Sequence, residues 1–283
     1  MAVGVSVIGC GHMGRHHARV AAMNPQTKLL AVYDVLQERA QSVAAQHNCR
    51  VDTDISADCK LVIIATPATS HQDWIRRARA KGCFVLVEKP VVASVSELKG
   101  LDGEDLMVGF SERFNPLLRG VHGRSPFSMV SQRTHPWVGR CADVDVVRDL
   151  MVHDLDLFCW WSDAIPTVRR ARGTIGKSGM FDAAEVTLAL PTGESAYFFA
   201  DRQCTTTRRT LSMHGPSGNI ELDLLRDAQS NANIRQTDAL CSQLEAALRH
   251  MSGHKSRIAL WKDGVRTVEL AEQIIQVAHE GYP

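Results

Sequence analysis

The chain has 283 residues, of which 45% are hydrophobic and 22% charged, an ordinary composition for a soluble globular protein. Its formal net charge is +1, so bulk attraction to nucleic acid or to an anionic membrane is not expected. The apolar runs are too short for a transmembrane helix, and the N-terminus lacks the basic segment of a signal peptide. Eight cysteines without C-x-x-C spacing favour a reducing cytoplasm over a disulfide framework or a zinc site, and no metal site is predicted.

The first 34 residues follow the order strand, glycine-rich turn, helix, strand and acid. Gly9 permits a tight turn, Gly11 lets the backbone approach a pyrophosphate, and Gly14 lets the helix pack close to the strand. The helix start presents unpaired N–H groups to the phosphates. Asp34 can accept hydrogen bonds from ribose hydroxyls, and its charge repels a 2′-phosphate, which favours NAD over NADP. The predicted cofactor site begins with Gly9, Gly11, His12, Met13, Gly14 and Asp34.

Short apolar runs alternate with amphipathic segments over roughly the first hundred residues, which is typical of parallel strands joined by helices. The predicted strands are 2–8, 29–34, 61–66, 83–88 and 106–110. The predicted helices are 14–23, 37–47 and 70–81. The sequence thus predicts an α/β protein whose N-terminal domain, residues 1–115, is a Rossmann domain with a doubly wound parallel sheet.

After Pro116 the pattern changes to strands joined by turns, with Pro-Thr-Gly at 191–193 and Gly-Pro-Ser-Gly at 215–218 as hairpin signals. Strands are predicted at 128–134, 167–175, 183–190, 195–200, 208–214 and 219–224. Helices are predicted from Asp149, from about Asp238, and from Asp263 to the end. Residues 116–283 are therefore expected to form an α+β domain with a mostly antiparallel sheet, which would bind the substrate.

Two polar groups stand in apolar surroundings. Lys89 follows the fourth predicted strand, at the edge where the dinucleotide crevice opens, although an exposed strand end explains a lone lysine equally well. Pro90 can hold a cis peptide bond there. On a regular helix, Asp149, His153 and Asp156 share one face, so Asp149 could orient His153 as a general base. A core histidine satisfied by its helix neighbour is the alternative. The adjacent Asp154 is expected to be solvated.

Nearly the whole chain resembles the Gfo/Idh/MocA family of NAD(P)-dependent oxidoreductases, which act mostly on sugars and cyclitols. The motifs that carry the resemblance are residues 9–14, 65–67 with His71, 88–90, and Asp149 with His153. The resemblance implies that the catalytic residues are Lys89, Asp149 and His153. It adds to the cofactor site Thr66, Pro67, His71 and Glu88.

The resemblance also implies a hydride-transfer mechanism. His153, oriented by Asp149, would take the proton of a secondary hydroxyl while Lys89 donates to the same oxygen. Lysine as the base remains an alternative. Asp156 would support this pair without touching substrate. Lys89 and His153 would therefore meet over the nicotinamide.

A narrower resemblance, to members that oxidise nucleotide sugars, covers residues 109–116, 148–156 and 200–211. It implies oxidation of UDP-N-acetylglucosamine at C3 to the 3-keto sugar, with an aminotransferase as pathway partner. Arg113, Asn115 and Arg133 are the predicted substrate-binding residues, because arginine suits a diphosphate. Surface charge and an Asn-Pro turn explain them equally well.

The segments 96–106 and 117–128 look shorter than in family members, which leaves substrate reach and subunit number open, although a homo-oligomer is expected. The alternative functions are a dehydrogenase of a free sugar or an inositol, a non-catalytic dinucleotide-sensing regulator, and a reductase of a non-sugar substrate. A scaffold without chemistry would need no glycine turn.

Overall fold

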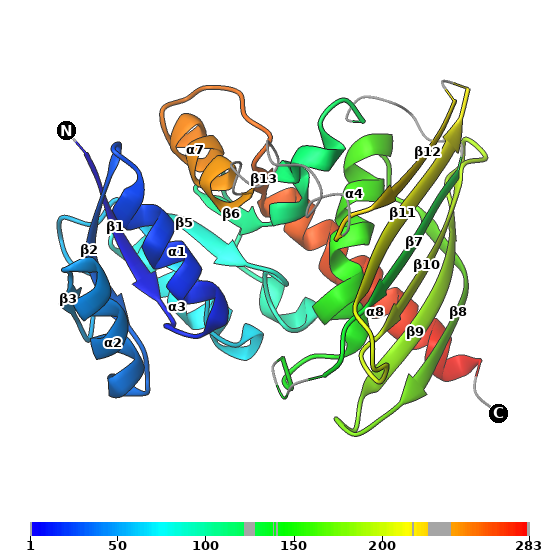
Figure 1. Cartoon of the computed structure of the whole chain (residues 1–283), viewed down its shortest axis with the longest axis horizontal. Coiled ribbons are helices and arrows are strands. Elements are labelled where there is room, and N and C mark those ends of the chain that lie inside the picture. The colour runs from blue at the N-terminus through cyan, green and yellow to red at the C-terminus, as the bar shows by residue number, and fades with distance from the viewer. Residues whose placement is uncertain are drawn as a thin grey trace. The chain divides into compact units, whose positions relative to one another are not determined.

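The structure is a computed structural model that describes residues 2–121, 128–137, 139, 141–216, 218–225 and 239–281. The chain divides into two compact units (Figure 1). Unit 1 comprises Met1–Ser111 and Ala239–Gly264, and unit 2 comprises Glu112–Asp238 and Val265–Pro283. The sequence placed one boundary between residues 115 and 116. The structure differs in returning Ala239–Gly264 to unit 1, because this segment adds a strand and a helix to the first sheet.

Unit 1 is built on a seven-stranded sheet with the order β13-β6-β5-β4-β1-β2-β3. Its strands are β1 (Val3–Ile8), β2 (Thr27–Tyr33), β3 (Arg50–Val51), β4 (Leu61–Ile64), β5 (Phe84–Glu88), β6 (Leu106–Gly109) and β13 (Ala259–Leu260). All neighbours pair in parallel except β13, which is antiparallel to β6. The order reverses between β1 and β4, and ligands of such sheets bind beyond the carboxyl ends of the strands at this point.

The helices of unit 1 lie between these strands in the chain. They are α1 (His12–Met23), α2 (Gln37–His47), α3 (His71–Ala80) and α7 (Ala239–Met251), with short 3-10 turns η1 (Ala68–Ser70) and η2 (Val95–Leu98). Helix α1 packs against both α2 and α7. The predicted parallel sheet and its three helices are confirmed. Where the sequence looked short, at residues 96–106, the structure has the single turn η2.

Unit 2 is built on a six-stranded sheet with the order β12-β11-β7-β10-β9-β8. Its strands are β7 (Ser128–Thr134), β8 (Thr167–Ile175), β9 (Phe181–Ala189), β10 (Ser195–Asp201), β11 (Arg208–Gly215) and β12 (Gly218–Asp223). Only the β7–β10 pair is parallel, so the predicted mostly antiparallel sheet is confirmed. Half of the shortened segment 117–128, residues 122–127, lies outside the described residues.

Helices cover one face of the second sheet (Figure 1). They are α4 (Val152–Ser162) and α8 (Trp261–Glu280), and shorter turns are η3 (Ser111–Phe114), η4 (Pro116–Leu118) and the π-helical η5 (Val147–Met151). Side chains of β10 point alternately to the two faces of the sheet, so Phe198 is buried. Its ring packs edge-on against Phe158 of α4, with the ring centroids 6.1 Å apart. Nearly every side chain of α4 is buried, so each polar group on this helix needs a partner. Among the described residues, no helix is long and apolar enough to span a bilayer.

Candidate active site

The glycine turn of unit 1 has the geometry that a dinucleotide requires. Gly9 has φ +92°, which favours glycine, and a Cβ on Gly14 would lie 1.7 Å from the carbonyl oxygen of Gly9. A Cβ on Gly11 would meet nothing within 4 Å, so its backbone faces open space. The residue before α1 is Gly11, which has no side chain to cap the helix, and a helix N-terminus favours an anion. In that first turn His12 is exposed and Met13 is half-buried. The turn therefore fits a pyrophosphate.

Asp34 lies immediately after β2 and joins the glycine turn to the next loop. Its Oδ2 accepts the Cys10 N–H at 2.7 Å, and its Oδ1 accepts the Leu36 N–H at 2.8 Å. Each carboxylate oxygen has a second lone pair, so the group retains acceptor capacity for ribose hydroxyls. Burial and the charge of Asp34 raise the pKa of the Cys10 thiol to about 12, so that this thiol stays neutral beside the turn.

Glu88 ties the end of β5 to α1. Its Oε1 lies 2.7 Å from Nε2 of His17, and both side chains are buried. Burial raises the pKa of the Glu88 carboxyl, but the hydrogen bond and charge of His17 outweigh burial and hold it below its usual range. The predicted cofactor residue thus has an internal partner. Lys89 follows it with a half-buried side chain, and the Lys89–Pro90 peptide bond is cis, as the sequence suggested.

His71 begins α3 and joins two loops at the same edge of the sheet. Its ring nitrogens lie 2.9 Å from the carbonyl oxygens of Thr66 and Pro90, which follow β4 and β5. The Thr66 hydroxyl in turn accepts the Ser70 hydroxyl at 2.8 Å. Pro67 is exposed next to it. The predicted cofactor residues therefore gather beyond the carboxyl ends of β1, β2, β4 and β5.

In unit 2, the segment that carries Asp149 is not a regular helix. Its backbone forms one wide π turn, η5, in which the Val152 N–H reaches back to the Val147 carbonyl. Asp145 caps this turn by accepting the N–H groups of Val147 and Arg148. The shared helical face of Asp149, His153 and Asp156 assumed a regular helix, from which the π turn departs, so that face stays a prediction.

The two outer acids of this trio pair with different arginines. The carboxylate of Asp149 lies 3.5 Å from the guanidinium of Arg202. Asp156 accepts two hydrogen bonds from Arg113, at 2.8 and 2.5 Å, and both side chains are buried. The Arg113 guanidinium also lies 4.9 Å from the ring centroid of Trp160.

The expectation that Asp154 is solvated is wrong. This side chain is buried and accepts two hydrogen bonds from Arg133, at 3.0 and 2.8 Å. Arg133 also donates to Glu112 at 3.2 Å, and Arg209 donates to the same Glu112 oxygen at 2.8 Å. We call Glu112, Arg133, Asp154 and Arg209 the Glu112 cluster. Because α4 is buried on nearly all sides, a carboxylate there must meet a cation.

The Glu112 cluster adjoins the candidate base. Burial raises the pKa of the Glu112 carboxyl, but the charges of Arg209, Arg133 and His153 outweigh burial and hold it far below its usual range. Glu112 is therefore an anion at neutral pH, close to His153. Sequence reasoning missed both Glu112 and Arg209, although a carboxylate between the buried residues Phe110 and Phe114 was a signal that it needs a partner.

The predicted substrate-binding residues make internal contacts in this structure. Arg113 and Arg133 are 3% and 2% exposed and pair with carboxylates of α4. Asn115 caps η4 by accepting the Leu117 N–H, and it donates to Glu112 at 3.0 Å. Their binding of substrate stays a prediction. The side chain of Arg209 is 37% exposed, so it is the cation of the Glu112 cluster that solvent reaches.

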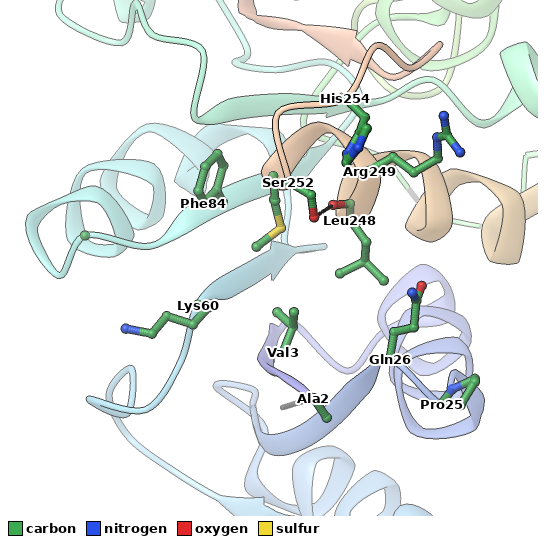
Figure 2. Close-up of a pocket in the computed structure, with 12 residues that line it drawn as sticks. Ala2, Val3, Pro25, Gln26, Lys60, Phe84, Leu248, Arg249, Ser252 and His254 are labelled. Atoms are coloured by element: carbon green, nitrogen blue, oxygen red, sulfur yellow. Dashed lines mark hydrogen bonds between the residues drawn. The ribbon is translucent and has the colours of Figure 1, made fainter.

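A surface pocket of about 860 Å³ also opens in unit 1 (Figure 2). It lies at the amino ends of β1, β4 and β5, the edge of the sheet opposite to the glycine turn. None of the predicted site residues lines this pocket. It is lined by Ala2, Val3, Pro25, Gln26, Lys60, Gly82, Phe84, Leu248, Arg249, Met251, Ser252 and His254. The described residues contain no group of three His, Cys, Asp or Glu side chains that could hold a metal ion.

Comparison with known proteins identifies a family and full-length relatives. Residues 3–102 match the model of Gfo/Idh/MocA, an oxidoreductase family with an NAD-binding Rossmann fold. UDP-N-acetylglucosamine 3-dehydrogenase of Acidithiobacillus ferrooxidans is 29% identical over 98% of this chain and 97% of its own length. A solved structure of that enzyme has a TM-score of 0.86 and covers 99% of both chains at 28% identity.

Two further similarities cover the whole length. Inositol 2-dehydrogenase of Rhizobium meliloti is 24% identical over 99% of this chain and 98% of its own. GenD2 from gentamicin A biosynthesis, solved in complex with NAD, shares the fold with a TM-score of 0.87 at 21% identity, over 99% of this chain and 95% of its own. From the family match, the full-length relatives and a glycine turn shaped for a dinucleotide, it follows that the chain belongs to the Gfo/Idh/MocA family of NAD-binding oxidoreductases.

Proposed function

We propose that the chain is an NAD-dependent dehydrogenase that oxidises a secondary hydroxyl of a sugar or nucleotide sugar. The favoured substrate is UDP-N-acetylglucosamine, oxidised at C3 to the 3-keto sugar. The observation that carries this proposal is the 29% identity to UDP-N-acetylglucosamine 3-dehydrogenase over 98% of the chain. The product would pass to an aminotransferase in the cytoplasm, and we expect the enzyme to work as a homo-oligomer.

Residues of unit 1 would hold the cofactor. The N–H groups of the glycine turn would bind the pyrophosphate, and Asp34 would accept the ribose hydroxyls with the lone pairs that its two backbone bonds leave. When bound, NAD supplies the acceptor for the two electrons and the carbon-bound hydrogen of the alcohol. Glu88 and His71 would act by fixing α1 and the two loops after β4 and β5 in their places.

His153 is the proposed general base. As the imidazole takes the proton of the substrate hydroxyl, it becomes positive, and the buried anion of Glu112 favours this charge. Asp149 would orient the ring. Lys89 would donate to the substrate oxygen and stabilise its developing negative charge. Exchange of the two roles, with Lys89 as base and His153 as orienting group, is the alternative chemistry for the same residues.

Arg209 is the proposed ligand of the substrate's diphosphate. Its guanidinium is anchored on Glu112 at 2.8 Å and is partly exposed. A guanidinium presents several donors in one plane, so it can bond Glu112 and still offer N–H groups to a phosphate oxygen. Arg113 and Arg133 already pair with Asp156 and Asp154 of α4, so we expect the diphosphate to bind Arg209 in preference to them.

A second candidate, a dehydrogenase of an inositol, is favoured by the full-length similarity to inositol 2-dehydrogenase. An inositol has no diphosphate, so it would not need Arg209. The experiment is a thermal-unfolding screen with NAD present, using UDP-sugars, free hexoses and inositols, followed by an NADH absorbance assay. A ligand at 100 times its Kd stabilises the native state by about 2.7 kcal/mol, which such a screen resolves.

The expected result is stabilisation and turnover with UDP-N-acetylglucosamine, and a raised KM for it in Arg209→Met but less so in Arg209→Lys. Turnover of inositols with no response to UDP-sugars would support the second candidate. Absence of turnover with every substrate would overturn the dehydrogenase proposal and leave a dinucleotide-sensing regulator.

A further inference from the structure

We propose that Arg202 is a positioning residue that holds the carboxylate of Asp149 in its working place. This inference rests on the proposed function, because it concerns a residue proposed to orient the catalytic histidine. Arg202 follows directly after β10, and its side chain is 1% exposed. An arginine buried so fully must have several partners, and here those partners come from three separate segments of unit 2.

The guanidinium of Arg202 makes four polar contacts. Nε donates to Asp182 at 2.8 Å, and one terminal nitrogen donates to the hydroxyl of Ser178 at 3.2 Å. The other terminal nitrogen donates to the carbonyl of Cys141 at 3.1 Å and reaches the carboxylate of Asp149 at 3.5 Å. The contact with Asp149 is therefore the longest of the four.

Asp182 and Ser178 bond each other as well as this arginine. The Asp182 carboxylate accepts hydrogen bonds from the Ser178 N–H at 3.1 Å and from the Ser178 hydroxyl at 2.5 Å. The backbone carbonyl of Asp182 accepts the Arg202 N–H at 2.9 Å. Burial raises the pKa of the Asp182 carboxyl, but the bonds from Ser178 and Arg202 outweigh burial and lower it, so this partner stays charged. Arg202 is consequently held by the β8–β9 hairpin, independently of Asp149.

Asp149, in contrast, lies on the π turn, where helical hydrogen bonds hold the backbone less regularly. Its contact with Arg202 uses the single oxygen Oδ2, unlike the two-bond pairs that fix Asp154 and Asp156. A 3.5 Å contact acts mainly through charge. Arg202 therefore draws the Asp149 carboxylate toward a fixed point through charge, which suits a group that must also orient an imidazole.

The test is a double-mutant cycle between Arg202→Lys and Asp149→Asn. Lysine keeps the charge but cannot reach all four partners at once. In the wild-type background we expect Arg202→Lys to lower kcat by about tenfold, less than the roughly 10²–10⁴-fold of a lost general base because His153 is retained, with KM and the Kd of NAD unchanged. In the Asp149→Asn background the same substitution should change kcat by less than about twofold, because coupled residues are not additive.

The control is Arg79→Lys, which makes the same substitution at an arginine paired with Asp105 in unit 1 and should leave kcat unchanged. If Arg202→Lys lowers kcat equally in both backgrounds, the proposed role of Arg202 is overturned, while the role of Asp149 is unaffected. Wild-type turnover in Asp149→Asn would overturn the proposed role of Asp149 itself, so the two failures are distinct. If Arg202→Lys does not fold, Ser178→Ala loosens the same guanidinium, and the same cycle with a smaller effect is expected.

Discussion

Asp154→Asn removes the charge that balances a buried arginine. The Glu112 cluster holds two guanidinium and two carboxylate groups, so its formal charge of zero becomes +1 in this variant. The substitution also turns an amide N–H toward Arg133, where a carboxylate oxygen accepted at 2.8 or 3.0 Å. Arg133 then has Glu112 as its remaining carboxylate, at 3.2 Å, and shares it with Arg209.

Breaking a buried ion pair from one side costs about 3–5 kcal/mol, because the other charge stays buried. The remaining bond to Glu112 favours the lower end of that range, about 3 kcal/mol. For a domain of this size that loss lowers Tm by roughly 6–12 °C. Urea unfolding followed by tryptophan fluorescence measures it directly, since Trp160 and Trp161 lie on the same helix as Asp154.

Two controls separate charge balance from simple disruption of α4. Asp54→Asn breaks an exposed pair with Lys81 and should leave the unfolding transition unchanged. The double variant Arg133→Met, Asp154→Leu should recover much of the lost stability, because apolar replacement of a whole buried pair is often neutral or stabilising. A free energy of unfolding for Asp154→Asn within about 1 kcal/mol of the wild-type value would refute the reasoning.

Three further outcomes are expected. His153→Ala should lower turnover by about 10²–10⁴-fold with NAD binding nearly intact, and unchanged turnover would remove this residue from the mechanism. Asp34→Ala should weaken NAD binding and relax discrimination against NADP, as titration with both cofactors would report; an equal preference in the wild type would contradict the role of Asp34. Because the folded pKa of Glu112 is depressed, its stabilisation is present above about pH 4.5 and is lost as pH falls below that value. In Glu112→Gln, stability should therefore fall less steeply as the pH is lowered. If the urea midpoint depends on acidic pH as strongly in this variant as in the wild type, the role of Glu112 is contradicted.

The sequence was sufficient for the elements whose signal is local. Apolar runs and amphipathic segments predicted the parallel sheet, and α2 occupies the predicted residues, Gln37–His47. Strands β3 and β13 were missed because each has two residues and carries no periodic pattern. The π turn at Val147–Met151 was missed because helical spacing assumes 3.6 residues per turn throughout.

The candidate site was predictable where a motif has a backbone cause, and less so where it depends on distant partners. Gly9 and Gly14 follow from close approach of main chain, which spacing alone reveals. Asp154 pairs with an arginine 21 residues away, and Asp156 pairs with one 43 residues away. Nothing in a single sequence supplies such pairs. The rule that a polar group on a buried helix needs a partner applied to Asp154 as well, and it would have corrected the expectation of a solvated side chain.

Strand β13, the last strand of unit 1, limits how the chain could be cut into separately folding fragments. β13 pairs with β6 through Ala259 and Leu260, more than a hundred residues after the first segment of unit 1 ends at Ser111. A fragment cut there would present the bare edge of β6, whose four residues are all buried in the whole chain, and such edges invite aggregation. To exchange unit 1 for that of a relative, both of its segments, Met1–Ser111 and Ala239–Gly264, would therefore have to be replaced.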